Sequence, residues 1–591
     1  MRKAITLLLF VVSITALFAQ APLIEWQKSY GGTSGDDAKA ILQTADGGYI
    51  VAGWSSSDNG DASVNYGKYD YWIVKLNSSG ILQWQKKIGG ASYDGANSIQ
   101  QTSDGGYIVA GHSASIDGDV TGNHGGGSEV KDYWIVKLND LGTIEWQKSL
   151  GGTGSDDAYS VIQTSDGGYI VAGEVYSNDG DVSGNHGNYD YWVAKLNTTG
   201  LIQWQKTYGG TSYDGARSIQ ETTDGGFIIA GNSNSDNGEV TGHHGTTFIS
   251  DCWVVKIDNA GIIEWQKSLG GTSNDVANSV LQTNDGGYIV AGWTQSTDGD
   301  VPLNNGLYDY WLIKLDNTGT IQWQKSFGGT SYDQGNSISK TSSGGYVVAG
   351  WSSSNDVDVT GHHGLTGASD YWIVNIDNSG TVLWQKSLGG TDNEVATCIE
   401  ETTDGGYIIT GTANFNNGDV TGNHGGNDYW VVKLEGCTFT QPTIFPDGNL
   451  LRSSSLTGNQ WYRNDTLIDG ATNQNYSVSL PVADTTCYTV MVTDNFSCAV
   501  ISEPYCYYPL PVGVSETNNI VSIFPNPIID VLTISGCNPT YLKLCNTLGQ
   551  TVAEANKINK LYVGNLSQGL YVLQLFDEKG GLVKTEKVVK E

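Results

Sequence analysis

The sequence predicts an all-β protein: a seven-bladed β-propeller followed by two small β-sandwiches. Three observations predict this fold. Glycine (79) and tryptophan (18) are abundant and methionine (2) is scarce, while Thr, Val, Ile and Tyr alternate with Gly, Asn and Asp, which is typical of short strands joined by tight turns. Residues 20–435 contain seven copies of one unit of about 60 residues. The last copy ends without the Trp-Gln-Lys strand that completes each other copy, and a strand with this sequence stands before the first copy.

Residues 1–19 have the pattern of a secretory signal peptide. Two basic residues precede an apolar run over residues 4–18, and Ala19 and Gln20 follow it. The run is short for a bilayer span, and a small residue stands at the expected cleavage point. Because no cysteine lies at this junction, we expect cleavage between Ala19 and Gln20 without a lipid anchor.

The formal net charge of −32 limits the range of partners. Coulomb repulsion disfavours nucleic acid and anionic membranes, so we expect no nucleic-acid partner. An acidic surface suits an exported protein, and it is compatible with calcium as a cofactor.

Each repeat contains four segments of strand composition, bounded by turn residues. A Trp-Gln-Lys segment is followed by Gly-Gly, then by an alternating segment such as 96–102, and then by an Asp-Gly-Gly turn and Tyr-Ile-Val-Ala-Gly. A long polar loop leads to Asp-Tyr-Trp-Ile-Val-Lys-Leu. The tryptophan of Trp-Gln-Lys recurs at Trp26, Trp84, Trp146, Trp204, Trp265, Trp323 and Trp384.

Four strands per repeat at a fixed period predict the blades of a propeller. Pairing of residues 22–30 with residues 428–434 would close the ring and remove two exposed sheet edges; an open solenoid would need polar caps instead. We expect the alternating segment to be the innermost strand and Trp-Gln-Lys the outermost. Ser-Tyr-Asp occurs in every second repeat, which indicates duplication of a two-blade unit; its tyrosines are Tyr93, Tyr213 and Tyr332.

Residues 436–512 resemble an immunoglobulin-like module that serves as a spacer, and residues 513–519 form a linker. Trp461 is the expected core tryptophan, and Tyr488 lies near the start of a late strand. The spacing of cysteines in antibody domains is not met. In an exported protein one or two disulfides are expected among four cysteines, with three pairings open: Cys437, Cys487, Cys498 and Cys506.

Residues 520–591 carry an ordered set of short motifs. They comprise Ile-Phe-Pro-Asn-Pro at 523–527, Asn-Thr-Leu-Gly at 546–549, Gly-Leu-Tyr-Val at 569–572 and Lys-Val-Val-Lys at the end. This order resembles the type A C-terminal sorting domain of type IX secretion substrates. The motif residues are Phe524, Pro525, Asn526, Pro527, Gly569, Tyr571, Lys587 and Lys590.

The resemblance implies a small β-sandwich that follows the Sec machinery to the type IX outer-membrane translocon. The cargo would then be released, or attached to lipopolysaccharide on the surface of a Gram-negative bacterium. The N-terminal repeats resemble propeller-type repeats of about 60 residues in secreted bacterial proteins, a family that implies no catalytic activity.

The loop that begins with Gly-Gly and the long polar loop of each repeat share one face of the predicted ring. We expect any functional site to lie on that face. Paired carboxylates in the long loops offer oxygen ligands to calcium, although turn formation also explains them. These pairs are Asp117 and Asp119, Asp179 and Asp181, and Asp298 and Asp300. The histidines of the long loops are the candidate zinc ligands. Because they lie on loops that diverge round the ring, they do not favour a shared four-ligand zinc site.

The residue that follows the second strand differs between repeats. It is Trp54, His112, Glu174, Asn232, Trp293, Trp351 and Thr412 in turn. Trp54, Trp293 and Trp351 could stack on sugar rings or cover the blade top. We therefore predict a binding or adhesion module for a glycan or surface partner. Binding is favoured over catalysis because no nucleophile–base pair or phosphate loop is evident. The alternative is a polysaccharide hydrolase or lyase, for which Glu174 and its neighbours are the candidates.

Overall fold

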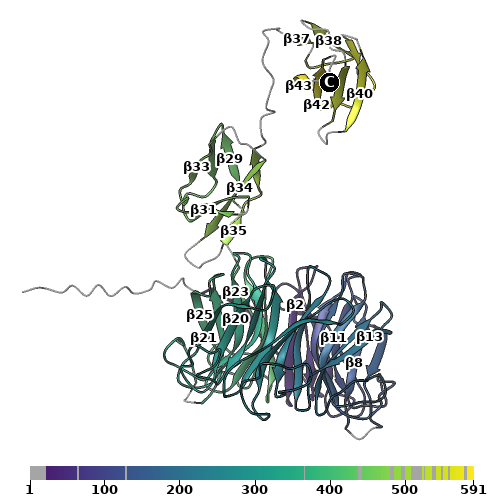
Figure 1. The fold of residues 1–591 in the computed structure, drawn as a ribbon, viewed down its shortest axis with the longest axis vertical. Coiled ribbons are helices and arrows are strands. Elements are labelled where there is room, and N and C mark those ends of the chain that lie inside the picture. The colour runs from purple at the N-terminus through teal and green to yellow at the C-terminus, as the bar shows by residue number, and fades with distance from the viewer. Residues whose placement is uncertain are drawn as a thin grey trace, which may run out of the picture.

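Figure 1 shows the computed structural model of the chain. It describes residues 21–591 except 63–64, 127–128, 365–366, 437–441, 465, 480–484, 494–498, 508–521, 525, 536–540, 547–549, 557–559 and 578–581. The predicted signal peptide, its cleavage site at Ala19 and Gln20, and Pro525 lie outside the described residues. Every regular element in the described part is a strand, and this part contains no apolar helix of membrane-spanning length.

Seven four-stranded antiparallel sheets occupy the described residues between 24 and 434, as the sequence predicts. Blades 1 to 4, from the innermost strand outward, are β2 (Asp36–Gln43), β3 (Tyr49–Ser55), β4 (Asp70–Leu76) and β5 (Leu82–Ile88); β6 (Asp94–Gln101), β7 (Tyr107–Ser113), β8 (Asp132–Leu138) and β9 (Ile144–Leu150); β10 (Asp156–Gln163), β11 (Tyr169–Val175), β12 (Asp190–Leu196) and β13 (Ile202–Tyr208); β14 (Asp214–Glu221), β15 (Phe227–Ser233), β16 (Asp251–Ile257) and β17 (Ile263–Leu269).

Blades 5 and 6 repeat this order, and blade 7 takes its outer strand from the N-terminus. Their strands are β18 (Asp275–Gln282), β19 (Tyr288–Thr294), β20 (Asp309–Leu315) and β21 (Ile321–Phe327); β22 (Asp333–Lys340), β23 (Tyr346–Ser352), β24 (Asp370–Ile376) and β25 (Val382–Leu388); β26 (Glu394–Glu401), β27 (Tyr407–Ala413), β28 (Asp428–Leu434) and β1 (Ile24–Tyr30).

The ring is closed by β1, which pairs antiparallel with β28 from Ile24 opposite Leu434 to Tyr30 opposite Tyr429. The indole N–H of Trp430 donates a hydrogen bond to the Gln27 side chain at 2.8 Å. This pairing confirms the closure predicted from the phase of the repeat, and it covers the edge of β28, so that β1 is the outer strand of blade 7.

The core of the propeller lies between neighbouring blades. The third-strand tryptophans are completely buried, as in Trp72 and Trp134. The tyrosine before each tryptophan packs on the tryptophan of the next blade and donates to its carbonyl; for example, the Tyr71 hydroxyl lies 2.7 Å from the Trp134 carbonyl oxygen. In blade 4, Cys252 replaces this tyrosine and is buried. Buried aromatic pairs of this kind fill the wedges between blades.

Side-chain hydrogen bonds connect the innermost strands of neighbouring blades. Ser98 in blade 2 accepts a hydrogen bond from the Val161 amide in blade 3, and Gln100 accepts one from the Gln163 amide. The junction between blades 7 and 1 differs, because the thiol of Cys398 donates to the Ile41 carbonyl and Glu400 accepts from the Gln43 amide. Side chains thus satisfy backbone groups at both kinds of junction.

The strands after the ring form two further pairs of sheets. The first pair is β29 (Ile444–Asp447), β30 (Leu450–Ser453) and β33 (Asn475–Ser477), with β31 (Asn459–Arg463), β32 (Thr466–Leu467), β34 (Thr486–Thr493), β35 (Ala499–Ile501) and β36 (Tyr505–Tyr507). Trp461 is fully buried there. The assignment to the immunoglobulin-like type stays a prediction. A disulfide joins Cys487 to Cys506, whereas Cys437 and Cys498 lie outside the described residues.

The second pair of sheets contains the sorting motifs. Its strands are β37 (Ser522–Phe524), β38 (Val531–Ser535) and β41 (Lys560–Tyr562), with β39 (Tyr541–Cys545), β40 (Thr551–Asn556), β42 (Gly569–Phe576) and β43 (Leu582–Lys590). Asn526 holds the last strand through hydrogen bonds with the Lys587 carbonyl and the Val589 amide, both at 2.8 Å. Gly569 pairs with Lys590, and Tyr571 is buried.

Candidate functional site

The Gly-Gly loops and the long loops lie together on one face of the ring, which we call the loop face. The long loop donates to the Gly-Gly loop, as from the Asp119 amide to the Gly89 carbonyl at 2.9 Å. The first carboxylates of the calcium candidates accept hydrogen bonds from loop amides at 2.8 Å, namely Asp117, Asp179 and Asp298. The second carboxylates accept from the first glycine of Gly-Gly at 3.2–3.3 Å, namely Asp119, Asp181 and Asp300.

These contacts hold two loops together, which is the structural role expected of acids in turns. Among the described residues, no three His, Cys, Asp or Glu side chains are grouped so as to hold a metal ion. Calcium at the three pairs stays a prediction. The long-loop histidines bridge neighbouring blades: His124 Nδ1 lies 2.8 Å from Asp132, and its Nε2 lies 3.9 Å from Asp181.

A pair of buried carboxyl groups lies at every blade junction and explains the first glycine of Gly-Gly. A Cβ atom at Gly89 would lie 2.6 Å from both Asp70 Oδ1 and Asp94 Oδ2, and the first glycine of each other repeat has an equivalent pair of neighbours. Both aspartates are fully buried. Burial raises the pKa of Asp70 to about 6, and the Asp94 carboxylate adds to this effect. Only glycine fits between such a pair.

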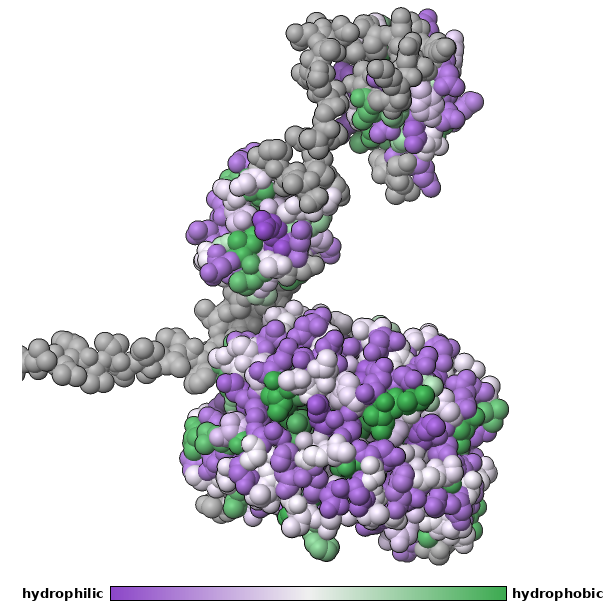
Figure 2. Space-filling model, viewed as in Figure 1, coloured by the Kyte–Doolittle hydropathy of each residue, from purple (hydrophilic) through white to green (hydrophobic). Residues whose placement is uncertain are grey.

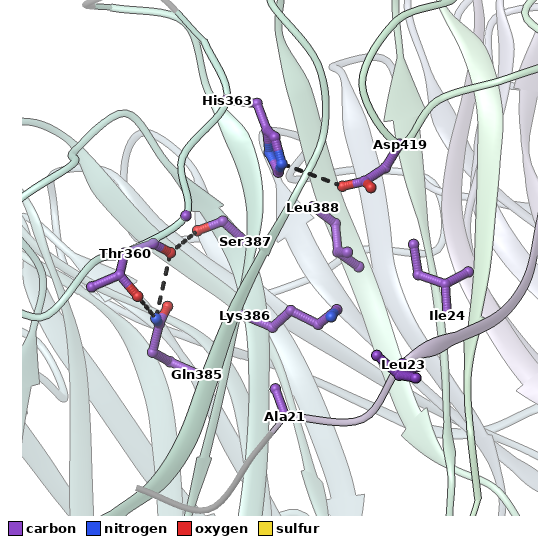
Figure 3. Close-up of a pocket in the computed structure, with 11 residues that line it drawn as sticks. Ala21, Leu23, Ile24, Thr360, His363, Gln385, Lys386, Ser387, Leu388 and Asp419 are labelled. Carbon is purple, nitrogen blue, oxygen red and sulfur yellow. Dashed lines mark hydrogen bonds and ion pairs between the residues drawn. The ribbon is translucent and has the colours of Figure 1, made fainter. Parts of the chain in front are cut away.

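A cavity of about 400 Å³ lies at the closing seam (Figure 3), between β1, the end of β25 and the long loops of blades 6 and 7. Its polar edge includes His363 Nε2, which lies 3.7 Å from Asp419. Burial lowers the pKa of Lys386, which lines the cavity. Because Ala21, Leu23 and Ile24 form its other wall, this cavity lies between blades 6 and 7, beside the strand that closes the ring.

The three predicted tryptophans reach solvent at the end of the second strand. Trp54, Trp293 and Trp351 are partly exposed, whereas the rest of each of their strands is buried. The corresponding residues of the other four blades are buried: His112, Glu174, Asn232 and Thr412. Among the seven described blades, this position therefore carries a half-buried indole in blades 1, 5 and 6 and a buried side chain in the other four.

Two of these tryptophans begin rows of aromatic rings that cross to the next blade. Trp54 lies 4.8 Å from Tyr69, which lies 4.8 Å from Tyr93 of blade 2. The same row in blades 5 and 6 is Trp293, Tyr308 and Tyr332, with centroid distances of 4.6 and 4.9 Å. The last ring of each row is the tyrosine of a Ser-Tyr-Asp motif, Tyr93 or Tyr332. The sequence analysis did not predict this contact.

A network of ionisable side chains lies on blades 3 and 4 of the same face. The Tyr159 hydroxyl donates to Glu174 at 3.2 Å, and the Tyr213 hydroxyl also donates to Glu174. Arg217 donates to the Tyr213 oxygen at 2.9 Å, and its guanidinium lies over the Tyr159 ring at 4.1 Å. This network holds the Glu174 carboxyl in one position between two blades.

A second acid, Asp157, lies next to this network. His112 Nδ1 lies 2.6 Å and Lys131 Nζ 3.3 Å from its carboxylate. Burial opposes ionisation, but these two neighbours outweigh it and hold the pKa of Asp157 well below its usual value. Burial raises the pKa of Glu174, with the Asp157 carboxylate adding to it and Arg217 opposing it. Two adjacent carboxyls thus have opposite pKa shifts.

Sequence reasoning named Glu174 but missed Asp157, Tyr159 and Arg217. Tyr159 and Arg217 stand at the bulged residue of the innermost strand, where Asn97 and Asn336 of other blades donate to the neighbouring blade's carbonyl at 2.8 Å. The departure from Asn at this position was visible in an alignment of the repeats.

Residues 522–591 match the model of the secretion system C-terminal sorting domain. The protein is a type IX secretion substrate. The sorting domain confirms the predicted handling by the type IX secretion system and places the protein outside a Gram-negative cell, secreted or on the surface. The predicted lipopolysaccharide attachment is a proposal.

Other similarities are distant. The regulatory protein FlaEY of Caulobacter vibrioides is 27% identical over 140 residues, which are 22% of this chain and 14% of that protein; the type IX substrate thus spans a small part of this curated relative. Sqt1 of Chaetomium thermophilum is 11% identical, with 82% of this chain and 100% of that chain covered and a TM-score of 0.35. PorZ, a surface component of the type-IX secretion system of Porphyromonas gingivalis, is 11% identical, with 96% and 75% covered and a TM-score of 0.25. The fold assignment therefore stands on the strand topology.

Proposed function

We propose that the propeller binds a glycan outside the cell through Trp54, Trp293 and Trp351. The exposure of these three indoles, at a position that is buried in the other four blades, carries this proposal. Flat aromatic faces with polar groups nearby are typical of ligand sites. A net charge of −32 favours a neutral glycan over an anionic one.

Figure 2 shows one side of the propeller. Hydrophilic residues cover most of the visible side of the ring, and the hydrophobic residues form separate patches. A surface role in adhesion follows from glycan binding together with type IX export, and lipopolysaccharide attachment would keep the module at the cell surface.

The test measures glycan binding by tryptophan variants. Replacing Trp293 or Trp351 with Ala should weaken binding to neutral polysaccharides by about 1–3 kcal/mol per ring, the size of base–aromatic stacking. Isothermal titration with xylan, galactomannan, mixed-linkage β-glucan and starch gives the affinities. Trp323→Ala is the matched control, because Trp323 is also half-buried but packs in the core of blades 5 and 6. Equal affinities for the intact protein and the triple variant would refute the proposal.

A further inference from the structure

We infer that the main glycan subsite lies at the junction of blades 5 and 6 and takes a linear, neutral chain of sugars whose ring substituents are equatorial. This inference rests on the glycan-binding function proposed above and names the place and the ligand class of that site. Two of the three half-buried indoles belong to this junction, because Trp293 ends the second strand of blade 5 and Trp351 that of blade 6.

Two tyrosines lie between these indoles, and the backbone holds both in place. Tyr308 lies 4.6 Å from Trp293 and forms an isolated parallel bridge with Tyr332 of blade 6. The Asp333 amide donates to the Tyr308 carbonyl at 2.8 Å. Because the long loop of blade 5 is thus bonded to the Gly-Gly loop of blade 6, the rings are ordered before a ligand binds, which lowers the entropic cost of binding.

Tyr332 continues the row of rings to Trp351. In blade 1 the residue equivalent to Tyr332 is Gly35, and a Cβ atom there would lie 3.8 Å from the ring of Trp54, the equivalent of Trp351. The first two strands pair in the same register in blades 1 and 6, so Tyr332 lies beside Trp351. An aromatic surface of four side chains therefore runs from the second strand of blade 5 to the second strand of blade 6.

The equivalent row at the junction of blades 1 and 2 is partly covered by an ion pair. Lys68 lies over the Tyr93 ring at 4.1 Å and contacts Glu129. Leu307 takes the place of Lys68 at the junction of blades 5 and 6. Leu307 and Tyr332 are 45% and 41% exposed. The uncharged aromatic surface is therefore more open between blades 5 and 6, and the row of blades 1 and 2 is the weaker subsite.

A polar side chain, Gln334, lies within this aromatic surface. It is opposite Trp351 in the β22–β23 pair, where blades 5 and 7 have Val276 and Val395. Its amide nitrogen donates to Asn336 at 3.2 Å, and no donor among the described residues is bonded to its amide oxygen. An amide oxygen beside aromatic rings suits a sugar, because the hydroxyls of the sugar need an acceptor next to its apolar face.

The tilt between the rings limits the class of glycan. The ring planes of Trp293 and Tyr308 meet at 34°, and those of Tyr308 and Tyr332 meet at 66°. Successive sugars of a bound chain thus meet aromatic surfaces of different orientation. A sugar with only equatorial hydroxyls has axial hydrogens on both faces and can stack with either, whereas an axial hydroxyl makes one face polar. The row therefore favours β-1,4-linked chains of glucose or xylose over chains of mannose.

Isothermal titration of the full exported chain with cellohexaose, xylohexaose and mannohexaose tests this inference. The first two should bind at least about tenfold more tightly than mannohexaose, and cellohexaose should bind at least about tenfold more tightly than cellobiose, since a longer chain contacts more of the rings. Equal affinity for mannohexaose and cellohexaose would overturn the ligand class, and equal affinity for cellobiose and cellohexaose would overturn recognition of a chain.

Two variants test the placement of the site. Tyr332→Ala and Gln334→Val should each weaken cellohexaose binding at least about fivefold, the lower end of the effect of losing one stacked ring. The scaffold accepts valine at this position in blades 5 and 7. Tyr93→Ala is the matched control: it removes the equivalent ring of blade 2 and should change the affinity less than about twofold. Equal melting temperatures establish that each variant is folded.

Saturation-transfer NMR of cellohexaose with the wild-type protein does not depend on the variants. Axial protons of both faces of the sugar rings should receive saturation, and transfer confined to one face would overturn the ligand class. Unchanged cellohexaose binding by Tyr332→Ala and Gln334→Val, or an equal loss in Tyr93→Ala, would overturn the placement and leave the proposed function intact. Absence of binding to every neutral polysaccharide would remove both.

Discussion

Removal of residues 20–30 deletes the strand that closes the ring. The deletion uncovers the edge of β28 over six residue pairs and removes Tyr30, which is 6% exposed and donates to the Gly80 carbonyl. Truncation of a buried aromatic residue costs about 3–5 kcal/mol. Loss of the strand should therefore cost at least this much of the roughly 5–15 kcal/mol that holds a domain folded.

Calorimetry of the intact and truncated exported proteins measures the effect. At roughly 2–4 °C per kcal/mol for domains of 150–250 residues, the propeller transition should fall by at least about 5 °C, and the exposed edge should promote aggregation. A synthetic peptide of residues 22–30 should restore part of the loss. If the truncated protein melts at the same temperature as the intact protein, β1 does not close the ring in solution.

Two further predictions concern pH and export. Burial raises the pKa of Asp156 and Asp309 to about 7 and that of Asp190 to about 6, so these carboxyls bind protons more tightly in the folded protein. The free energy of unfolding should therefore rise as pH falls from about 8 to about 5. A urea unfolding midpoint that falls over that range would contradict this prediction. Deletion of residues 522–591 should leave the protein in the periplasm, whereas fusion of these residues to a periplasmic reporter should export it; surface detection of the truncated protein would refute the assignment.

The strand order and the closure of the ring could be predicted because they depend on local signals. Each strand is bounded by turn residues, and the phase of the repeat predicts the pairing of the N-terminal strand with residues 428–434 that the structure shows. The pairing of Cys487 with Cys506 could not be chosen from sequence, because it depends on β34 lying beside β36.

The network around Glu174 could be predicted from the sequence only in part, for a related reason. Asp157 and Glu174 meet through strand register, and Tyr213 and Arg217 come from the next blade. Their approach depends on the angle between two packed sheets, which no spacing reveals. By contrast, Trp54 and Trp293 were found from sequence because they differ from the other repeats at one aligned position.

An odd number of blades made from a two-blade unit places two blades of the same kind side by side, at the junction of blades 7 and 1. There Cys398 and Glu400 contact Ile41 and Gln43 of blade 1. If closure occurred one blade early, Gln43 would face Ser339 of blade 6, a shorter side chain without a carboxylate. The inner strands of this junction therefore distinguish a ring of seven from a ring of six.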